Sequence, residues 1–175
     1  DGRDQASTGY DVYGARIRGD GILSDQDMFA ISRAAGDQRL PAAAYSGTTN
    51  QYLVAWDDSR SSQSDIYGQR LYGLGFPAGA EFGISAAEES HEAPDVAFNT
   101  VDHEYLVVWA GARNSTAPGT TAIWAQRYDR DGLPLGQNWT VADQGHSLIG
   151  PVVTYNPVDN GYLIVWKDTL EDALE

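Results

Sequence analysis

The side chains that could do chemistry in this chain are carboxylates, arginines and histidines in short polar stretches between apolar segments. Such side chains bind polar ligands through charge-assisted hydrogen bonds, and a well-placed carboxylate or imidazole can also move a proton. No pair of them has the spacing of metal ligands, and no motif predicts a bound cofactor. The residues that we select as candidates for ligand binding are Asp57, Asp58, Arg60, His91, Glu92, Arg113 and His146.

Catalytic chemistry has little support in the sequence. The chain has no nucleophile elbow, no phosphate-binding loop and no paired metal-binding histidines. Carboxylates are abundant, and a glycosidase needs two of them placed about 5–10 Å apart across a cleft. Sequence spacing does not give that distance, so we assign no catalytic residue.

An apolar pentapeptide organises the chain and recurs three times, as Tyr52–Trp56, Tyr105–Trp109 and Tyr162–Trp166. Each copy is rich in β-branched and aromatic residues, too short for a core helix and bounded by polar turns, which predicts a strand. Apolar and polar residues do not alternate within it, so both faces of the strand should be buried. Repeats at intervals of 53 and 57 residues are typical of propellers and other arrays.

The pentapeptide is segment B of four segments, A to D, that recur in one order. Segment A opens at a proline, segment C alternates apolar and polar residues, and a glycine turn connects segment C to segment D. The order along the chain is C-D, A-B-C-D, A-B-C-D, A-B, which predicts twelve strands, or three four-stranded blades, in one domain, 1–175. The predicted blades span 41–86, 94–142 and, split between the two termini, 10–33 with 151–168.

The repeat resembles the β-propeller modules of bacterial extracellular proteins, whose blades carry the pattern YLVVW, then DIYGQR, then a glycine turn. The residues that carry the resemblance include Tyr105–Trp109 and Asp65–Arg70. The resemblance implies an all-β propeller of four-stranded antiparallel blades with segment A innermost, in a secreted or extracellular protein. It also implies that the D–A and B–C loops, which carry the candidate residues, emerge on one face.

Residues that recur in every copy are expected to maintain the repeat. We expect Trp56, Trp109 and Trp166 to fill the core between blades, although tryptophan can also stack on sugars. Each of three equivalent arginines is expected to pair with an acidic residue near the end of a segment B, such as Asp58 or Asp168. These arginines are Arg16, Arg70 and Arg127. The histidines do not recur, and each is expected to be exposed to solvent.

The composition narrows the range of partners. The chain has 25 acidic and 11 basic residues and a net charge of −14, which argues against nucleic acid and anionic membranes as partners. It has no cysteine, and no apolar run reaches the ~18 residues that a membrane span needs. The many carboxylates predict weak, non-specific association with divalent ions and no structural metal.

Two functions remain open at this point. The first is a non-enzymatic extracellular binding or scaffold module that binds a protein or a glycan through the loops of one face. The second is a carbohydrate-active enzyme similar to a glycosidase, or a fragment of one, with catalytic carboxylates on the D–A loops. A deep central pocket with two converging carboxylates would favour the enzyme, and a flat or blocked face would favour the binding module.

Three blade equivalents fall short of the roughly four to eight blades of known propellers. The terminal halves, C-D at the start and A-B at the end, can complete one another across two chains. This arrangement predicts a homodimer that forms one six-bladed ring around a twofold axis. The alternative is that the chain is a piece of a longer propeller. Its start at Asp1, without a methionine, is expected of a processed or excised product.

Overall fold

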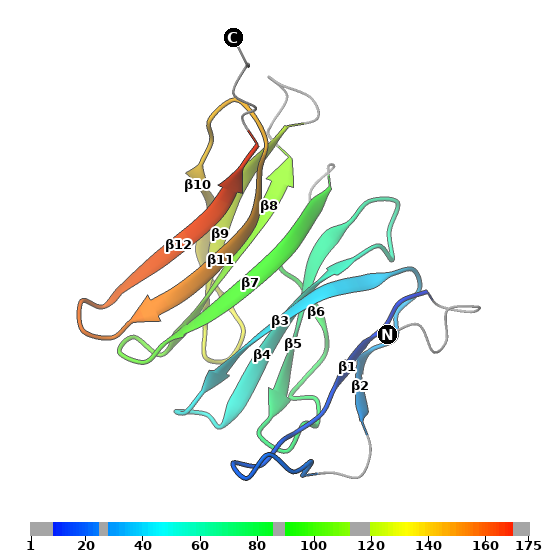
Figure 1. The fold of residues 1–175 in the computed structure, drawn as a ribbon. Coiled ribbons are helices and arrows are strands. Elements are labelled where there is room, and N and C mark those ends of the chain that lie inside the picture. The colour runs from blue at the N-terminus through cyan, green and yellow to red at the C-terminus, as the bar shows by residue number, and fades with distance from the viewer. Residues whose placement is uncertain (1–8, 25–27, 86–89, 113–119, 170–175) are drawn as a thin grey trace.

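The computed structural model describes residues 9–24, 28–85, 90–112 and 120–169 (Figure 1). Within these ranges the chain forms twelve strands and no helix, so the described part contains no helix that could cross a membrane. The prediction of an all-β protein is confirmed.

Two four-stranded antiparallel sheets form the middle of the molecule. The first consists of β3 (Gln38–Ser46), β4 (Gln51–Asp58), β5 (Asp65–Tyr72) and β6 (Phe82–Gly83). The second consists of β7 (His91–Asn99), β8 (Glu104–Ala112), β9 (Thr121–Asp129) and β10 (Pro134–Ala142). Two-stranded sheets are formed by β1 (Val12–Gly14) with β2 (Phe29–Ser32), and by β11 (Leu148–Asn156) with β12 (Gly161–Asp168).

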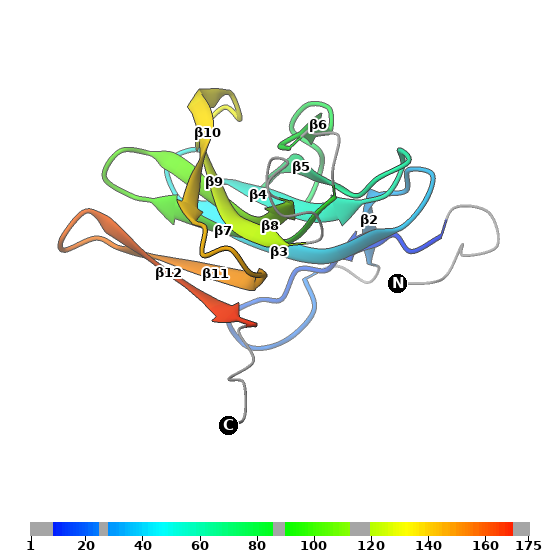
Figure 2. The ribbon, with the colours of Figure 1, turned by 90° about the horizontal axis from the view of Figure 1, so that it is seen from above.

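The four sheets follow one another in chain order, with the two-stranded sheets at opposite ends (Figures 1 and 2). Their first strands are neighbours, since β3 contacts β7 and β7 contacts β11. Antiparallel pairing brings the starts of β3, β7 and β11 to the same edge as the ends of β4, β8 and β12. We call this edge the loop face, because the connections that carry the candidate residues emerge there.

A bulge recurs near the start of each first strand. The sequence predicts that these strands begin at a proline, but each begins three residues earlier, and its register shifts as it passes the proline. Proline has no N–H to donate to the ladder, and a bulge removes the need for that donor. The residue before each proline takes a positive φ, of 49°, 52° and 59° at Leu40, Ala93 and Gly150 respectively.

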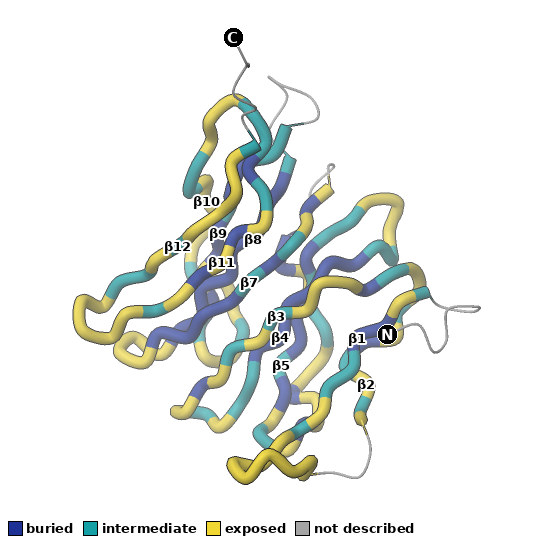
Figure 3. The backbone as a smooth tube through the Cα atoms, viewed as in Figure 1, coloured by how far each residue is buried: buried dark blue, intermediate teal, exposed yellow. Residues whose placement is uncertain are grey.

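The second strands of the complete sheets form the core. Leu53 and Trp56 in β4, and Val108 and Trp109 in β8, have no exposed surface (Figure 3). One face of each strand packs against the sheet before it and the other against the sheet after it. The prediction that these strands are buried on both faces is therefore confirmed for β4 and β8.

The equivalent strand β12 does not follow the prediction. Leu163 is 61% exposed, Val165 is 51% exposed and Trp166 is 37% exposed. Within the described residues no further sheet covers the face with Leu163 and Val165, and no third strand pairs with β12 beside Trp166. The burial expected of Trp166 is thus wrong for the single chain, because burial of a segment B depends on neighbouring strands and sheets that the described residues do not supply here.

The repeated arginines pair at the other end of the sheet from Asp58. Arg70 donates from Nη1 to Gln51 Oε1 (3.0 Å), and Arg127 Nη1 lies 3.5 Å from Glu104 Oε1. Both acceptors are at the start of a second strand. The predicted pairing with the end of that strand is wrong, because β5 runs antiparallel to β4 and brings Arg70 beside Leu53.

Candidate functional site

The loop face gathers most of the predicted binding residues. Asp57 and Asp58 end β4, Arg60 follows them, and His91 and Glu92 begin β7. His146 lies just before β11, where its Nε2 is 2.7 Å from Asp168 Oδ1 at the end of β12. Arg113 lies outside the described residues.

Asp58 and Arg60 form a partly buried ion pair. The Asp58 carboxylate is fully buried and accepts hydrogen bonds from Trp56 Nε1 (2.8 Å) and from the Arg60 backbone N–H (2.9 Å). The Arg60 guanidinium donates to both Asp58 oxygens (2.8 and 2.6 Å) and to Glu81 (2.7 Å), and it lies 3.9 Å from the centre of the Tyr67 ring. A network of charge-assisted bonds in a buried setting holds the loop after β4 in one conformation.

His91 is buried, so the exposure expected of it is wrong. Its Nδ1 lies 2.7 Å from Ser85 Oγ, which in turn accepts the Ile66 backbone N–H (2.9 Å), and its ring meets the edge of Trp109. The ring occupies space that a side chain at Gly111 would need, since a Cβ there would lie 2.3 Å from His91 Cδ2. Gly111 stands at the repeat position of Asp58, and the missing carboxylate leaves room for the imidazole.

Asp57 joins two sheets at the loop face. Asp57 as a whole residue is only 8% exposed. Its Oδ1 accepts the backbone N–H of Ala93 (2.8 Å), at the bulge of the next sheet. Burial, with a smaller contribution from the negative charge of Glu92, raises the pKa of Asp57 to about 7. The bond from Ala93 and the positive charge of Arg39 oppose this rise without cancelling it. Asp57 therefore changes its protonation state near neutral pH.

Polar side chains that the repeat does not share surround Asp57. Arg39 lies directly opposite Asp57 in the β3–β4 register, pairs with Asp37, and places its guanidinium 4.8 Å from the centre of the Tyr10 ring. Asp37 also accepts the Tyr10 backbone N–H (3.0 Å). We call Tyr10, Asp37, Arg39, Asp57 and Glu92 the Asp57 cluster.

Asp57 and Glu92 were predicted as ligand-binding residues, whereas the other three members of this cluster were not. The sequence signal for such positions is that the residue type differs between copies of the repeat. Position 39 is Arg where the equivalent first-strand positions hold Glu92 and Ile149, and position 57 is Asp where the second strands hold Ala110 and Lys167. Residues that vary between copies of a repeat are free to serve a site instead of the scaffold.

The Asp57 cluster can bind polar groups and exchange a proton, but it offers no metal centre. Within the described ranges no group of three His, Asp or Glu side chains could hold a metal ion. The exposed Glu92 and Arg39 can accept from and donate to hydroxyl groups, and the Tyr10 ring offers an apolar face beside them.

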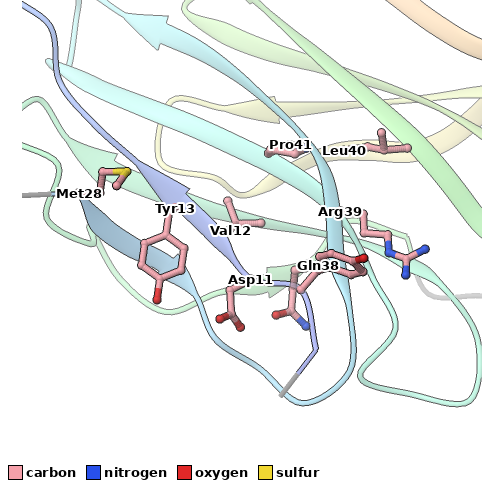
Figure 4. A pocket seen from close by; sticks show the side chains of 9 residues that line it. Asp11, Val12, Tyr13, Met28, Gln38, Arg39, Leu40 and Pro41 are labelled. Carbon is pink, nitrogen blue, oxygen red and sulfur yellow. The ribbon is translucent and has the colours of Figure 1, made fainter. Parts of the chain in front are cut away.

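A groove opens between the first two-stranded sheet and β3, next to the cluster. Figure 4 shows Val12, Tyr13 and Met28 on the side of β1 and β2, with Leu40 and Pro41 on β3. Tyr10 and Arg39 stand at the loop-face end of its lining. The groove is largely apolar, in contrast to the charged cluster.

Comparison with known proteins finds structural likeness alone. No family model matches the chain, and no curated protein matches it. The endo-arabinase from Bacteroides thetaiotaomicron VPI-5482 gives a TM-score of 0.53 at 13% identity, over 82% of this chain and 57% of that one. A putative TolB from Agrobacterium tumefaciens gives a TM-score of 0.45 at 16% identity, over 92% of this chain and 56% of that one.

The endo-arabinase is a propeller-type protein, and this chain spans little more than half the length of each of the two structures. At 13% identity the likeness to the endo-arabinase concerns the fold and not the chemistry. It agrees with the radial arrangement of four-stranded sheets around neighbouring first strands. The β-propeller architecture that the repeat pattern implies is therefore supported.

Proposed function

We propose that the chain is an extracellular binding module that holds a glycan at the Asp57 cluster on its loop face. The observation that carries this proposal is the set of unrepeated, partly exposed polar side chains around one buried carboxylate, at the ends of strands that pack between neighbouring sheets. Binding residues are commonly carried at loop ends above such a scaffold.

The chemistry of the cluster suits a sugar. Arg39 and Glu92 supply a donor and an acceptor for vicinal hydroxyls, and the Tyr10 ring can lie against the apolar face of a pyranose or furanose. One of the similar solved structures is named an endo-arabinase, so carbohydrates come first among the ligands to be tested.

The test begins with a glycan array on the wild-type chain, followed by calorimetric titration of the strongest hit. Arg39→Gln should weaken binding about 10-fold or more, because a charge-assisted bond contributes about 1.5–3 kcal/mol. Arg130→Gln is the matched control: Arg130 is equally exposed, at 54% against 55%, but lies in the β9–β10 turn away from the loop face.

The control should bind like the wild type. If the array shows no hit, or if both variants bind as tightly as the wild-type chain, glycan binding at the Asp57 cluster is wrong.

A second function, glycoside hydrolysis, is favoured by one observation, the pKa of about 7 at Asp57. A carboxylic acid that is protonated at neutral pH can donate its proton to a leaving group, and Glu92 would be its partner carboxylate. Hydrolysis of arabinan or of chromogenic glycosides, with a pH limb near 7 that Asp57→Asn removes, would establish this function. Binding without turnover favours the module.

We propose that the complete module is a ring of six blade equivalents contributed by two copies of the chain. Roughly four to eight blades are needed to close a propeller, and the described part of the chain forms two full sheets and two half-sheets. Each ring would carry two Asp57 clusters on the same face.

A further inference from the structure

We infer that the two copies complete each other's half-sheets by strand pairing, β12 of one copy lying antiparallel to β1 of the other. The pairing occurs twice around a twofold axis. This inference rests on the proposed six-blade module and adds the strands, the register and the surfaces that make the contact.

The β12 side of the contact is an uncovered apolar strand. In β4 the equivalents of Leu163 and Val165 are Leu53 and Ala55. They have no exposed surface, because they pack against the first two strands of the following sheet. Leu163 and Val165 keep the same apolar character but face solvent in the single chain. Apolar surface of this kind on a strand edge marks an interface.

The β1 side of the contact is a pair of grooves. The groove of Figure 4, between β1 and β3, lies where a complete sheet would have its first two strands. A second groove lies between the β1–β2 sheet and the sheet that follows it, and is lined by Phe29 and Ile31 of β2 and by Tyr52 and Val54 of β4. In the middle of the molecule, side chains equivalent to Leu163 and Val165 fill the space between successive sheets. The grooves thus provide the space that β11 and β12 of a second copy would need.

The register follows from the complete sheets. In the β4–β5 pair Leu53 is opposite Arg70 and Trp56 is opposite Tyr67. In the β8–β9 pair the same positions place Leu106 opposite Arg127 and Trp109 opposite Trp124. Transferred to the contact between copies, Leu163 lies opposite Arg16, Val165 opposite Gly14, and Trp166 opposite Tyr13.

A second copy is the occupant that fits both edges. Among the described residues the β1–β2 sheet is a C-D pair and the β11–β12 sheet is an A-B pair, so the two half-sheets are complementary. Within one chain β1 and β12 lie at opposite ends of the molecule (Figure 1). Two copies related by a twofold axis satisfy both edges at once and leave no free strand.

A disulfide cross-link tests the register, because the chain has no cysteine of its own. Leu163→Cys and Arg16→Cys, made in separate chains and mixed under oxidising conditions, should give a disulfide-linked dimer. Lys167→Cys mixed with Arg16→Cys is the control. Lys167 lies four residues along the same face of β12, about 13 Å away at 3.3 Å per residue, beyond the Cα separation of about 4.4–6.8 Å that a disulfide spans.

The double variant Leu163→Cys/Arg16→Cys tests the twofold closure. It should give a covalent dimer and no larger covalent multimer. A series of larger disulfide-linked multimers would overturn the closed arrangement. If the wild-type chain dimerises but Leu163→Cys fails to link to Arg16→Cys, or links no better than the control, the register is wrong while the six-blade module stands.

A charged substitution on the uncovered strand tests the surface itself. Leu163→Lys should abolish dimerisation and leave the fold of the single chain intact, since Leu163 faces solvent there. Val158→Lys, at an 88% exposed position in the β11–β12 turn, should leave the dimer unchanged. Dimerisation of Leu163→Lys at wild-type concentration would overturn the inference, and circular dichroism of each variant confirms that it is folded.

Discussion

Asp57 lies where two sheets meet, and its carboxylate serves both. It ends β4 and accepts a backbone bond from Ala93 at the bulge of β7. Ala110 and Lys167 stand at the equivalent positions of the other second strands, so the repeat itself does not require a carboxylate there. A buried acid with a raised pKa beside an exposed Glu92 and an exposed Arg39 is the arrangement in this chain that best fits a functional site.

The pKa of Asp57 predicts how stability depends on pH. Because folding raises this pKa from 3.8 to about 7, the folded state binds more protons than the unfolded state between these values. The stabilising contribution is fully present below about pH 4 and is lost as the pH rises through 7. The side chain of Asp57→Asn stays neutral at every pH. Between pH 5 and pH 8 the unfolding free energy of the wild type should therefore fall by on the order of 1–3 kcal/mol relative to that of the variant. Urea melts at the two pH values measure it, and parallel curves for both proteins would contradict the raised pKa.

At the scale of elements, sequence repetition and sheet completeness have separate effects. Trp109 and Trp166 occupy the same repeat position, yet Trp109 is buried and Trp166 is partly exposed. The difference arises from the neighbouring strands: β8 pairs with a strand on both sides, whereas β12 pairs with one among the residues that the structure describes.

Substitution of the two tryptophans by alanine separates these effects. Trp109→Ala should cost about 3–5 kcal/mol of unfolding free energy, the usual range for truncating a buried large aromatic. Trp166→Ala, measured in dilute monomer, should cost clearly less, because part of the ring already faces water. Equal losses in urea melts, or a loss below about 1 kcal/mol for Trp109→Ala, would contradict the account of β8 as buried on both faces.

The repeat made the strands predictable, because alternation and apolar runs are local properties of the sequence. Contacts between strands were harder to predict. Arg70 reaches Gln51 and not Asp58, since the antiparallel register decides which end of β4 it meets. His91 is buried because Gly111 leaves it space, and such a compensation between two sequence positions has no periodic signal.

The Asp57 cluster shows the same limit. Asp57 and Glu92 stood out as polar residues in predicted loops, whereas the contribution of Tyr10 depends on how the first sheet packs beside β3. The pKa of Asp57 depends on burial that only the assembled sheets provide.

At the scale of the whole molecule, the net charge of −14 opposes association of two copies. The proposed contact is apolar and made by strand pairing, so it does not depend on charge attraction. Salt screens the repulsion over a Debye length of about 8–10 Å, and association should therefore strengthen as ionic strength rises.

The mass of the intact chain in solution tests the central claim most directly. Multi-angle light scattering at low micromolar concentration and physiological salt should give twice the chain mass of 19.0 kDa, as expected for a closed ring of two copies. A stable mass near 19.0 kDa that does not change with concentration or salt would show that the half-sheets remain uncovered, and it would contradict the six-blade module.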